Sequence, residues 1–312
     1  MTEKVAVLLG GHSAEREVSL RSGTAVLNAL LASGVNAFAF DPKLQPITEL
    51  VTSGATKVFI VLHGRGGEDG TMQGALQTLG LAYTGSGVLG SALAMDKIRC
   101  KRLFQAQNLA TAPFAVVHSQ DTDFASLLAD LGGKVMVKPA NEGSSIGMSA
   151  ANNVAELEQA VKNALVYDTE ILIERWISGR EFTVSIVNDQ VLPIIEMRTP
   201  HDFYDYDAKY QANTTEYLCP APISAEQTAL MQQCALQAFK AVGASGWGRV
   251  DLMMDSAGQH YLLEVNTVPG MTEKSLVPMA AKAAGMSFQQ LVVAILAQAD
   301  SHTTSKTELM SK

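Results

Sequence analysis

The stretch that decides the fold is a candidate β-hairpin, which reads Gly248-Arg-Val-Asp-Leu-Met-Met-Asp255, Ser256-Ala-Gly-Gln259 and His260-Tyr-Leu-Leu-Glu-Val-Asn-Thr-Val-Pro-Gly270. Side chains alternate between the two faces of a strand, so each arm presents three residues on one face. These triplets are Arg249, Asp251 and Met253, and Leu262, Glu264 and Asn266. A turn centred on Ser256-Ala257 predicts Arg249 opposite Glu264 and Asp251 opposite Leu262.

In this register two carboxylates, one amide and one guanidinium converge, with Asp251 and Glu264 as diagonal neighbours roughly 7–8 Å apart. Their oxygens suit a hard ion such as Mg²⁺, which usually takes further ligands from substrate phosphates. The pattern therefore favours nucleotide chemistry. The alternative is a solvated hairpin face with an arginine–carboxylate pair, which does not explain the abrupt turn Thr267-Val-Pro-Gly-Met271.

Composition narrows the class of protein. A chain of 312 residues predicts two or three domains, and 47% apolar with 17% charged residues is ordinary for an α/β enzyme. The net charge of −8, with no basic cluster to offset it, argues against a nucleic-acid partner. No apolar run approaches a membrane span and no signal peptide is present, so we expect a cytoplasmic protein without a membrane partner. Three cysteines without metal-ligand spacing receive no role.

The first 90 or so residues predict a doubly wound α/β unit with a parallel sheet. Val5-Ala-Val-Leu-Leu9 is a buried strand, and Ser13 is a candidate N-cap for a helix that runs towards Leu31. Further strands are expected at residues 38–40 and 58–62, with helices near residues 47–51 and 72–79. Ligands of such sheets bind beyond the carboxyl ends of the strands.

Two loops lie at those strand ends, Gly10-Gly-His-Ser13 and His63-Gly-Arg-Gly-Gly-Glu-Asp-Gly70. Glu15 is either an acid that favours the start of a helix or a carboxylate that binds a substrate ammonium group. His63 is either a satisfied structural histidine or a binding residue. Position in the sequence leaves both alternatives open.

The stretch Gly85-Ser-Gly-Val-Leu-Gly90 matches the dinucleotide pattern G-x-G-x-x-G. That fingerprint normally occupies the first strand–helix turn and is followed by an acid about 20 residues later. Here several elements precede it, and the chain continues through Met95-Asp-Lys97 into a helix. A nicotinamide-dependent dehydrogenase is therefore the weakest alternative.

Strands at residues 114–117 and 135–139, around a helix at residues 123–131, lead to Ala140-Asn-Glu-Gly-Ser-Ser-Ile-Gly-Met148. Lys138 followed by this glycine- and serine-rich loop predicts a phosphate cover, because it offers backbone donors, two hydroxyls and a cation. An ordinary hairpin loop is the alternative.

Strands at residues 170–177, 181–186 and 190–195 have antiparallel character, which indicates a change of domain near residues 95–110. Residues 198–222 are polar and tyrosine-rich, and a loop of this length is either a functional lid or a disordered segment. Helices are expected at residues 225–242, 276–284 and 288–299.

With these pieces in order, the chain resembles the D-alanine–D-alanine ligases of the ATP-grasp superfamily along nearly its whole length. The resemblance rests on a series of spaced motifs: Gly-Gly-x-Ser-x-Glu at the start, His63-Gly, Asp96-Lys97, Lys138-Pro139 with Glu142-Gly-Ser-Ser145, Glu181-Phe-Thr-Val184, Lys209-Tyr210, Arg249-Val-Asp251 and Glu264-Val-Asn-Thr-x-Pro-Gly270. It implies an N-terminal α/β substrate-binding domain (1–95), a central domain (96–182) and a C-terminal domain (183–312). The last two would be α+β units that sandwich ATP, with residues 198–222 as the lid.

The resemblance also implies roles for individual residues. Those that bind ATP would be Lys97, Lys138, Glu174, Trp176, Glu181 and Lys209. Those that hold two Mg²⁺ ions, with Mn²⁺ as a substitute, would be Asp251, Glu264 and Asn266. Those that bind or activate the amino-acid substrates would be Glu15, His63, Ser144, Tyr210, Arg249, Gly270, Ser275 and Leu276.

The implied chemistry is ATP-dependent ligation of two D-alanines through an acyl phosphate, for peptidoglycan precursors, by a homodimer. Glu15 would pair with the ammonium of the first D-alanine, helped by Ser144 and Tyr210. Arg249 and a backbone N–H near Gly270 would stabilise the tetrahedral oxyanion, and Ser275 with the Leu276 backbone would bind the second carboxylate.

Three points stay open. Tyr210 favours D-alanine as the second substrate, whereas D-lactate or D-serine would be the alternative. A non-catalytic nucleotide sensor is a hypothesis from another class, which the set of polar residues on the hairpin argues against. Asn141 departs from the family, whose members often carry a basic residue there, so loop closure or phosphate contacts are expected to differ.

Overall fold

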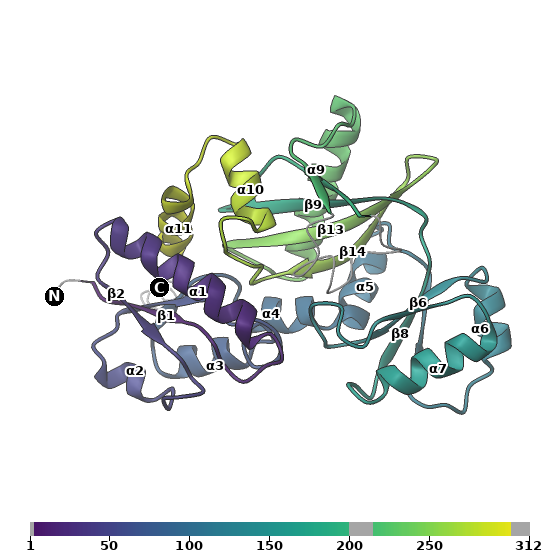
Figure 1. Cartoon of the computed structure of the whole chain (residues 1–312), viewed down its shortest axis with the longest axis horizontal. Helices are drawn as coiled ribbons and strands as arrows, with labels where there is room; N and C mark the ends of the chain where they lie inside the picture. The colour runs from purple at the N-terminus through teal and green to yellow at the C-terminus, as the bar shows by residue number, and fades with distance from the viewer. Residues whose placement is uncertain (1–2, 200–214, 301–312) are drawn as a thin grey trace, which may run out of the picture.

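The computed structural model describes residues 3–199 and 215–300, in which three β-sheets follow one another along the chain (Figure 1). The first sheet is parallel, and the other two are antiparallel. The parallel sheet ends with β4 (Ala82–Tyr83) and the first antiparallel strand is β5 (Phe114–Val117), so the sheet type changes on either side of the domain boundary expected near residues 95–110.

The parallel sheet has the strand order β2-β1-β3-β4. Its remaining elements are β1 (Val5–Leu8), α1 (Arg16–Ala32), β2 (Ala37–Phe40), α2 (Glu49–Thr52), β3 (Lys57–Ile60) and α3 (Thr71–Thr78). Every residue of β1 is buried, as its continuous apolar run predicts for a central strand. The short β4 lacks such a run and was not predicted.

Helix α1 does not begin at the predicted N-cap. Ser13 Oγ donates to the carbonyl of His63 at 2.7 Å and accepts from the amide of Glu15 at 3.2 Å, so this side chain joins two loops. The N-cap position belongs to Glu15, whose side chain makes no capping hydrogen bond. The Ser13 prediction is wrong because a long-range contact competes successfully with the local cap.

The four-stranded antiparallel sheet has the order β5-β8-β6-β7, with its helices on one side. Its elements are α6 (Phe124–Asp130), β6 (Val135–Pro139), β7 (Ser149–Ala151), α7 (Val154–Ala164) and β8 (Ile171–Arg175). Asp123 and Asn153 cap α6 and α7 by accepting from Ser126 and Glu156 amides at 3.1 and 2.9 Å. The helices cover a compact apolar core of their own.

The six-stranded sheet has the order β12-β11-β9-β13-β14, with β10 beside β9. The strands are β9 (Gly179–Val187), β10 (Gln190–Val191), β11 (Ile195–Arg198), β12 (Glu216–Leu218), β13 (Trp247–Asp255) and β14 (His260–Asn266). The single strand predicted at residues 190–195 is thus two short strands. β12 falls inside the segment predicted to be structureless, of which residues 200–214 lie outside the described residues.

Helices α4 (Val88–Met95) and α5 (Lys97–Ala106) connect the parallel sheet to the rest, and α9 (Ala225–Ala241) packs against β13 and β14. The glycine-rich stretch 85–90 runs into α4 and lets this helix approach the chain just after α9. A Cβ on Gly90 would lie 2.3 Å from the Gly243 carbonyl oxygen, so only glycine permits the contact. Close backbone packing therefore explains a glycine of this motif without a bound dinucleotide.

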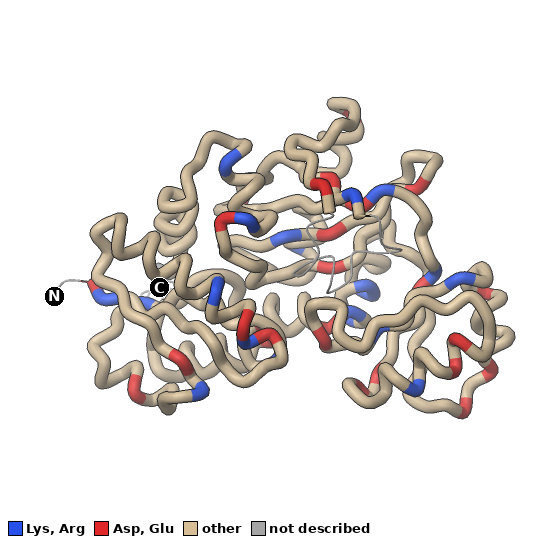
Figure 2. Tube along the Cα trace, in the orientation of Figure 1, with Lys and Arg blue, Asp and Glu red and all other residues tan. Residues whose placement is uncertain are grey.

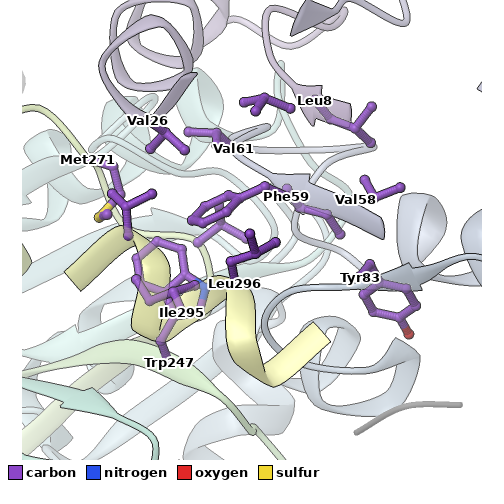
Figure 3. Packing of buried hydrophobic residues seen from close by; sticks show 14 of the residues in the cluster. Leu8, Val26, Val58, Phe59, Val61, Tyr83, Trp247, Met271, Ile295 and Leu296 are labelled. Atoms are coloured by element: carbon purple, nitrogen blue, oxygen red, sulfur yellow. The ribbon is translucent and has the colours of Figure 1, made fainter. Parts of the chain in front are cut away.

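The core of the parallel sheet includes residues from the other end of the chain. Helices α10 (Leu276–Ala283) and α11 (Phe288–Ala297), followed by η1 (Gln298–Asp300), join it. Figure 3 shows Ile295 and Leu296 beside Phe59 and Trp247, whose ring centroids lie 6.4 Å apart. Burying each such side chain contributes roughly 1.5–3 kcal/mol, so the two ends of the chain stabilise one another.

The three sheets can be compared with the domain boundaries expected from the sequence, which divide the chain into residues 1–95, 96–182 and 183–312. The boundary at 182/183 falls within β9, so the sheets would place it before Gly179. We propose a division by sheet, in which α10 and α11 pack with the N-terminal unit. Within the described part of the chain no single helix is long and apolar enough to cross a membrane, and α10 and α11, bent by 105° at their junction, meet that test only together.

Candidate active site

A cavity of about 380 Å³ lies between the four-stranded and the six-stranded sheet. Part of its wall is apolar and comes from both sheets: Met136, Met148, Trp176, Ile177, Met197, Met253 and Leu263. The rest is charged, and Figure 2 shows acidic and basic positions close together along β13 and β14. An apolar slot that opens beside fixed charges can hold a flat aromatic ring attached to an anionic group.

On the side of the four-stranded sheet, the charged wall is a buried cluster of one acid and two bases. Glu174 Oε1, on β8, accepts from Lys101 Nζ at 2.8 Å, and Glu174 Oε2 lies 2.6 Å from Lys138 Nζ of β6. Lys101, on α5, is fully buried and also donates to Thr111 Oγ1. The cluster has a net charge of +1, and Lys138 brings that charge to the cavity.

The titration of this cluster follows from its charges. Burial by itself would raise the pKa of Glu174, but the two ammonium groups outweigh burial and lower that pKa to about 2. Burial would lower the pKa of Lys138, yet Glu174 outweighs it and the pKa is raised. The pKa of Lys101 is lowered because burial dominates there. Lys101 and its role are absent from the sequence prediction, since nothing local marks a buried lysine.

On the side of the six-stranded sheet, the wall is acidic and centres on Asp251 of β13. Arg249 Nε and an Arg249 terminal nitrogen donate to the two Asp251 oxygens at 2.8 and 2.7 Å. Thr183 Oγ1 of β9 donates to the same carboxylate at 2.6 Å, and Asn266 Nδ2 of β14 donates at 3.1 Å. The structure thus brings Arg249, Asp251 and Asn266 together as predicted, and adds Thr183.

The hairpin register differs from the prediction because of a β-bulge. Asp251 pairs with Glu264 and Arg249 with Asn266, whereas the next pair along the hairpin is Leu252 with Leu262. Leu263 is therefore the extra residue on β14, and the bulge interrupts the alternation of faces. The two carboxylates lie directly opposite one another rather than diagonally. Leu262 enters the core, and Leu263 lines the cavity instead.

Lys97 connects the acidic wall to the loop after β6. Asp96 caps α5 by accepting from the Arg99 amide at 2.9 Å, which places Lys97 at the first residue of the helix. Lys97 Nζ donates to the Glu142 carbonyl at 2.6 Å and lies 3.6 Å from Glu264 Oε2. Lys97 therefore faces the cavity beside both groups.

The loop of residues 140–148 forms a lip of the cavity. Ser144 and Ser145 adopt φ values of 50° and 61° in the left-handed region, and both line the cavity with Glu142. Asn141, where relatives were expected to carry a basic residue, donates its amide and its Nδ2 to Asp168 Oδ2 at 2.9 and 3.0 Å. This residue thus anchors the start of the loop.

The same loop reaches the N-terminal unit. Ser144 Oγ donates to Glu15 Oε1, so this predicted pair meets. His63 is buried, and its Nδ1 donates to the Val268 carbonyl at 2.8 Å. Burial lowers the pKa of His63, so the ring is neutral at pH 7 with Nε2 as a hydrogen-bond acceptor. In the part of the chain that the structure describes, Nε2 has no hydrogen-bond partner.

Glu68 also lies at the junction with the N-terminal unit, and it was not predicted from the sequence as a site residue. Its Oε1 accepts from the Gly64 amide at 2.9 Å, and it borders a small cavity of about 20 Å³ together with Lys97, Gly143 and Asn266. Burial and the charge of Glu15 raise the pKa of Glu68 to about 8. An acid in a glycine-rich loop at the carboxyl end of a strand was the signal available in the sequence.

The turn after β14 carries the last predicted residues. A Cβ on Gly270 would lie 3.2 Å from Ser275 Oγ, and Ser275 is the N-cap of α10, whose first residue is the buried Leu276. The Met271 amide donates to Ser22 Oγ of α1 at 3.1 Å. This turn is thereby held against the N-terminal unit.

The structure places most of the predicted residues in two groups, while Asn266 borders the small cavity and Arg249 binds Asp251. Around the large cavity lie Lys97, Lys138, Ser144, Glu174, Trp176, Glu181, Asp251 and Glu264. At the junction with the N-terminal unit lie Glu15, His63, Gly270, Ser275 and Leu276, with Ser144 in contact with Glu15. Lys209 and Tyr210 lie outside the described residues.

The donor set fits a small hard cation in part. Among residues 3–199 and 215–300, no three His, Cys, Asp or Glu side chains converge as a metal cage. Asp251 and Glu264 oppose one another, and the Asn266 amide, which donates through Nδ2, keeps its oxygen as a ligand atom. Two carboxylates and an amide suit Mg²⁺ when phosphate oxygens complete the shell.

Comparison with known proteins agrees with this geometry. The family model described as "D-ala D-ala ligase C-terminus" matches residues 103–297. The D-alanine–D-alanine ligase of Pseudoalteromonas translucida (strain TAC 125) is 64% identical over 95% of this chain and 96% of its own length. That of Pseudoalteromonas atlantica (strain T6c / ATCC BAA-1087) is 57% identical over 95% and 94%.

Solved structures give the same result. The Bacillus anthracis D-alanine–D-alanine ligase complexed with ATP has a TM-score of 0.86 and 29% identity, covering 98% of this chain and 100% of that one. The VanG D-Ala:D-Ser ligase of Enterococcus faecalis has a TM-score of 0.82 and 28% identity over 96% and 100%. The expected fold class, an ATP-grasp fold with an N-terminal parallel sheet and antiparallel sheets after it, is confirmed. This chain belongs to the D-alanine–D-alanine ligase family.

Proposed function

We propose that this chain ligates two D-alanines to D-alanyl-D-alanine at the expense of ATP, which becomes ADP and phosphate, to supply peptidoglycan precursors. One observation carries the proposal: a cluster of net positive charge and a pair of opposed carboxylates face a single cavity from two different sheets. That arrangement suits a nucleotide triphosphate with its metal ions. Relatives at 55–64% identity named D-alanine–D-alanine ligase support the choice of substrate.

The nucleotide would lie between the two sheets. Its base would occupy the apolar slot near Trp176 and Met253, with Glu174 and Glu181 beside the base and the ribose. Lys97 and Lys138 would neutralise its phosphates, helped by backbone and hydroxyl donors of the 140–148 loop and by Lys209. Because Glu174 holds Lys138 in place, the lysine needs no reorganisation when the phosphates arrive.

Asp251, Glu264 and Asn266 would hold two Mg²⁺ ions, which Mn²⁺ could replace. When bound, these ions would neutralise charge on the transferring phosphoryl group. The chain's own part is to keep the Asp251 carboxylate oriented, which the hydrogen bonds from Thr183 and Asn266 do. Arg249 shares that carboxylate and would turn one nitrogen to the substrate oxyanion.

The first D-alanine would bind where Glu15 meets Ser144, because a carboxylate and a hydroxyl there can receive its ammonium, with Tyr210 helping from the lid. Its carboxylate attacks the γ-phosphorus, ADP leaves, and an acyl phosphate forms. The amine of the second D-alanine then attacks the acyl carbon, and phosphate leaves. His63 Nε2 would accept a hydrogen bond from a substrate ammonium, and Ser275 and Leu276 would hold the second carboxylate near Gly270.

The experiment is an assay of the purified chain with Mg²⁺, ATP and millimolar D-alanine. The proposal predicts phosphate release and D-alanyl-D-alanine, detected by mass spectrometry, with D-alanine and not with L-alanine. If D-alanine gave neither phosphate nor dipeptide, the proposal would be refuted. ATP binding without turnover under any of these conditions would favour the sensor hypothesis instead.

D-lactate or D-serine as the second substrate is the remaining alternative, and a D-Ala:D-Ser ligase is among the structural relatives. Competition between acceptors across pH separates D-lactate from the two amino acids, and the product mass separates D-alanyl-D-serine from D-alanyl-D-alanine. An amine nucleophile becomes more reactive as it loses its proton, whereas a hydroxy acid acceptor does not gain in this way. Dipeptide that dominates increasingly over depsipeptide as pH rises would argue against D-lactate, and a dipeptide with the mass of D-alanyl-D-alanine would indicate D-alanine.

We further propose that the chain works in the cytoplasm, where ATP is supplied, and as a homodimer. Leu31, Leu44 and Val51 in the N-terminal unit are 51%, 73% and 56% exposed, which offers apolar surface for a second copy. Sedimentation equilibrium tests this: a mass of one chain at micromolar concentration would contradict the dimer.

A further inference from the structure

Arg65 lies in the glycine-rich loop of the N-terminal unit and makes its contacts with residues far away in the sequence. Its Nε donates to Glu142 Oε1 at 2.7 Å, across 77 residues. A terminal nitrogen donates to Asp168 Oδ2 and to the Tyr167 carbonyl, each at 3.1 Å. One guanidinium thus joins the N-terminal unit to two segments that border the central sheet.

Both carboxylates that Arg65 contacts belong to the support of the 140–148 loop. Glu142 is in the loop, and its carbonyl accepts from Lys97 Nζ at 2.6 Å. Asp168 receives the amide and the side chain of Asn141. Burial would raise the pKa of Asp168, but its hydrogen bonds lower it, so this anchor is ionised at neutral pH.

The loop needs such support, because its backbone is held in a conformation that side chains rarely adopt. Ser144 and Ser145 have positive φ, and residues of this kind persist only where surrounding contacts fix them. The same serines line the cavity, and Ser144 contacts Glu15. A shift of the loop would therefore move both Glu142, which binds Lys97, and Ser144, which binds Glu15.

We propose that Arg65 is a positioning residue that holds the 140–148 loop closed over the nucleotide cavity by bridging Glu142 and Asp168 to the N-terminal unit. The inference rests on the proposed function only in taking that cavity as the ATP site. Arg65 itself does not line the cavity, so it acts on the nucleotide through the loop. Because Arg65 pairs with both anchors at once, it also offsets negative charge beside the site where phosphates would bind.

The test compares Arg65→Gln with a matched control, Arg99→Gln. The Arg99 side chain is 44% exposed against 48% for Arg65, and it also pairs with two carboxylates, Asp96 and Glu170. In the described part of the chain its side chain makes no hydrogen bond or ion pair with the 140–148 loop. Calorimetry with Mg²⁺ and a non-hydrolysable ATP analogue should show a dissociation constant raised about five- to tenfold for Arg65→Gln and less than twofold for Arg99→Gln. Arg65→Lys should recover part of the affinity, because an ammonium cannot make the forked contact.

Hydrogen exchange of the free protein measures the loop directly. Arg65→Gln should raise amide exchange in residues 140–148 with an unchanged melting temperature, and in an Asp168→Asn background the same substitution should have a smaller effect. In turnover, KM for ATP should rise while kcat stays within about twofold. Wild-type exchange rates and wild-type analogue affinity in Arg65→Gln would overturn the proposal, as would an equal loss in Arg99→Gln. Exchange and binding need no D-alanine, so absent ligation would refute the proposed function without deciding the role of Arg65.

Discussion

The two charged walls of the cavity carry surplus charge of opposite sign. On the four-stranded sheet, one carboxylate, Glu174, lies between two lysines, and the surplus is a positive charge. On the six-stranded sheet, Asp251 is held by one arginine and two neutral donors while Glu264 lies opposite, and the surplus is negative. The difference teaches that each wall suits a partner of opposite sign, which under the proposed function is phosphate on one side and a cation on the other.

The largest effect should come from breaking the buried cluster. Lys101→Met leaves Glu174 with one partner in a buried site, and removing one member of such a pair costs about 3–5 kcal/mol in the free energy of unfolding. Urea unfolding measures the loss. Lys240→Met, which removes a surface ion pair with Asp189 at 3.7 Å, is the control and should cost less than about 1 kcal/mol. Equal losses in the two variants would show that the cluster is not what stabilises this wall.

On the acidic wall, Arg249→Ala should slow ligation roughly 10²–10³-fold, since the proposed donor to the oxyanion is removed. Thr183 and Asn266 still hold Asp251, so affinity for the ATP analogue should stay within about threefold. Rapid-quench measurement of dipeptide and calorimetric binding separate the two steps. If turnover is intact, the role assigned to Arg249 is wrong.

The wall on the four-stranded sheet should respond to acid through Glu174. The pKa of Glu174 is about 2 in the folded protein, below its ordinary value of 4.5. Its stabilisation is therefore complete above about pH 5 and is lost as pH falls towards 2, by about 3 kcal/mol in all. Unfolding free energies between pH 5.5 and 3 should fall more steeply for the wild type than for Glu174→Gln. Parallel curves would contradict this assignment of charge.

The smallest effect concerns the metal. Asp251→Asn should raise the Mg²⁺ concentration needed for half-maximal phosphate release by about 10–100-fold, because the proposed anionic ligand becomes neutral. Asp255→Asn, on the same strand at the hairpin turn, is the matched control and should leave the Mg²⁺ dependence unchanged. A wild-type Mg²⁺ dependence for Asp251→Asn would show that Asp251 is not a metal ligand.

Much of the fold was predictable because the signals were local. Buried apolar runs identified β1, β3, β6 and β8, and the strands predicted at residues 170–195 were expected to be antiparallel. The hairpin was found by its alternation, but its register was not, since a bulge at Leu263 leaves no clear mark in the sequence. Glu15 as the N-cap of α1 was missed because Ser13 is tied to His63, 50 residues away.

The candidate site also has features that local sequence predicts and features that it does not. Residue types by themselves determined the chemistry of this protein: oxygen ligands on one hairpin, lysines ahead of a glycine-rich loop, and the motif series that marks the family. Only the tertiary structure decided which charges meet. The buried Lys101 beside Glu174, the raised pKa of Glu68 and the bridge from Arg65 to Glu142 and Asp168 all join segments distant in sequence. Their energies depend on burial and on distance, and neither quantity exists until the three sheets pack together.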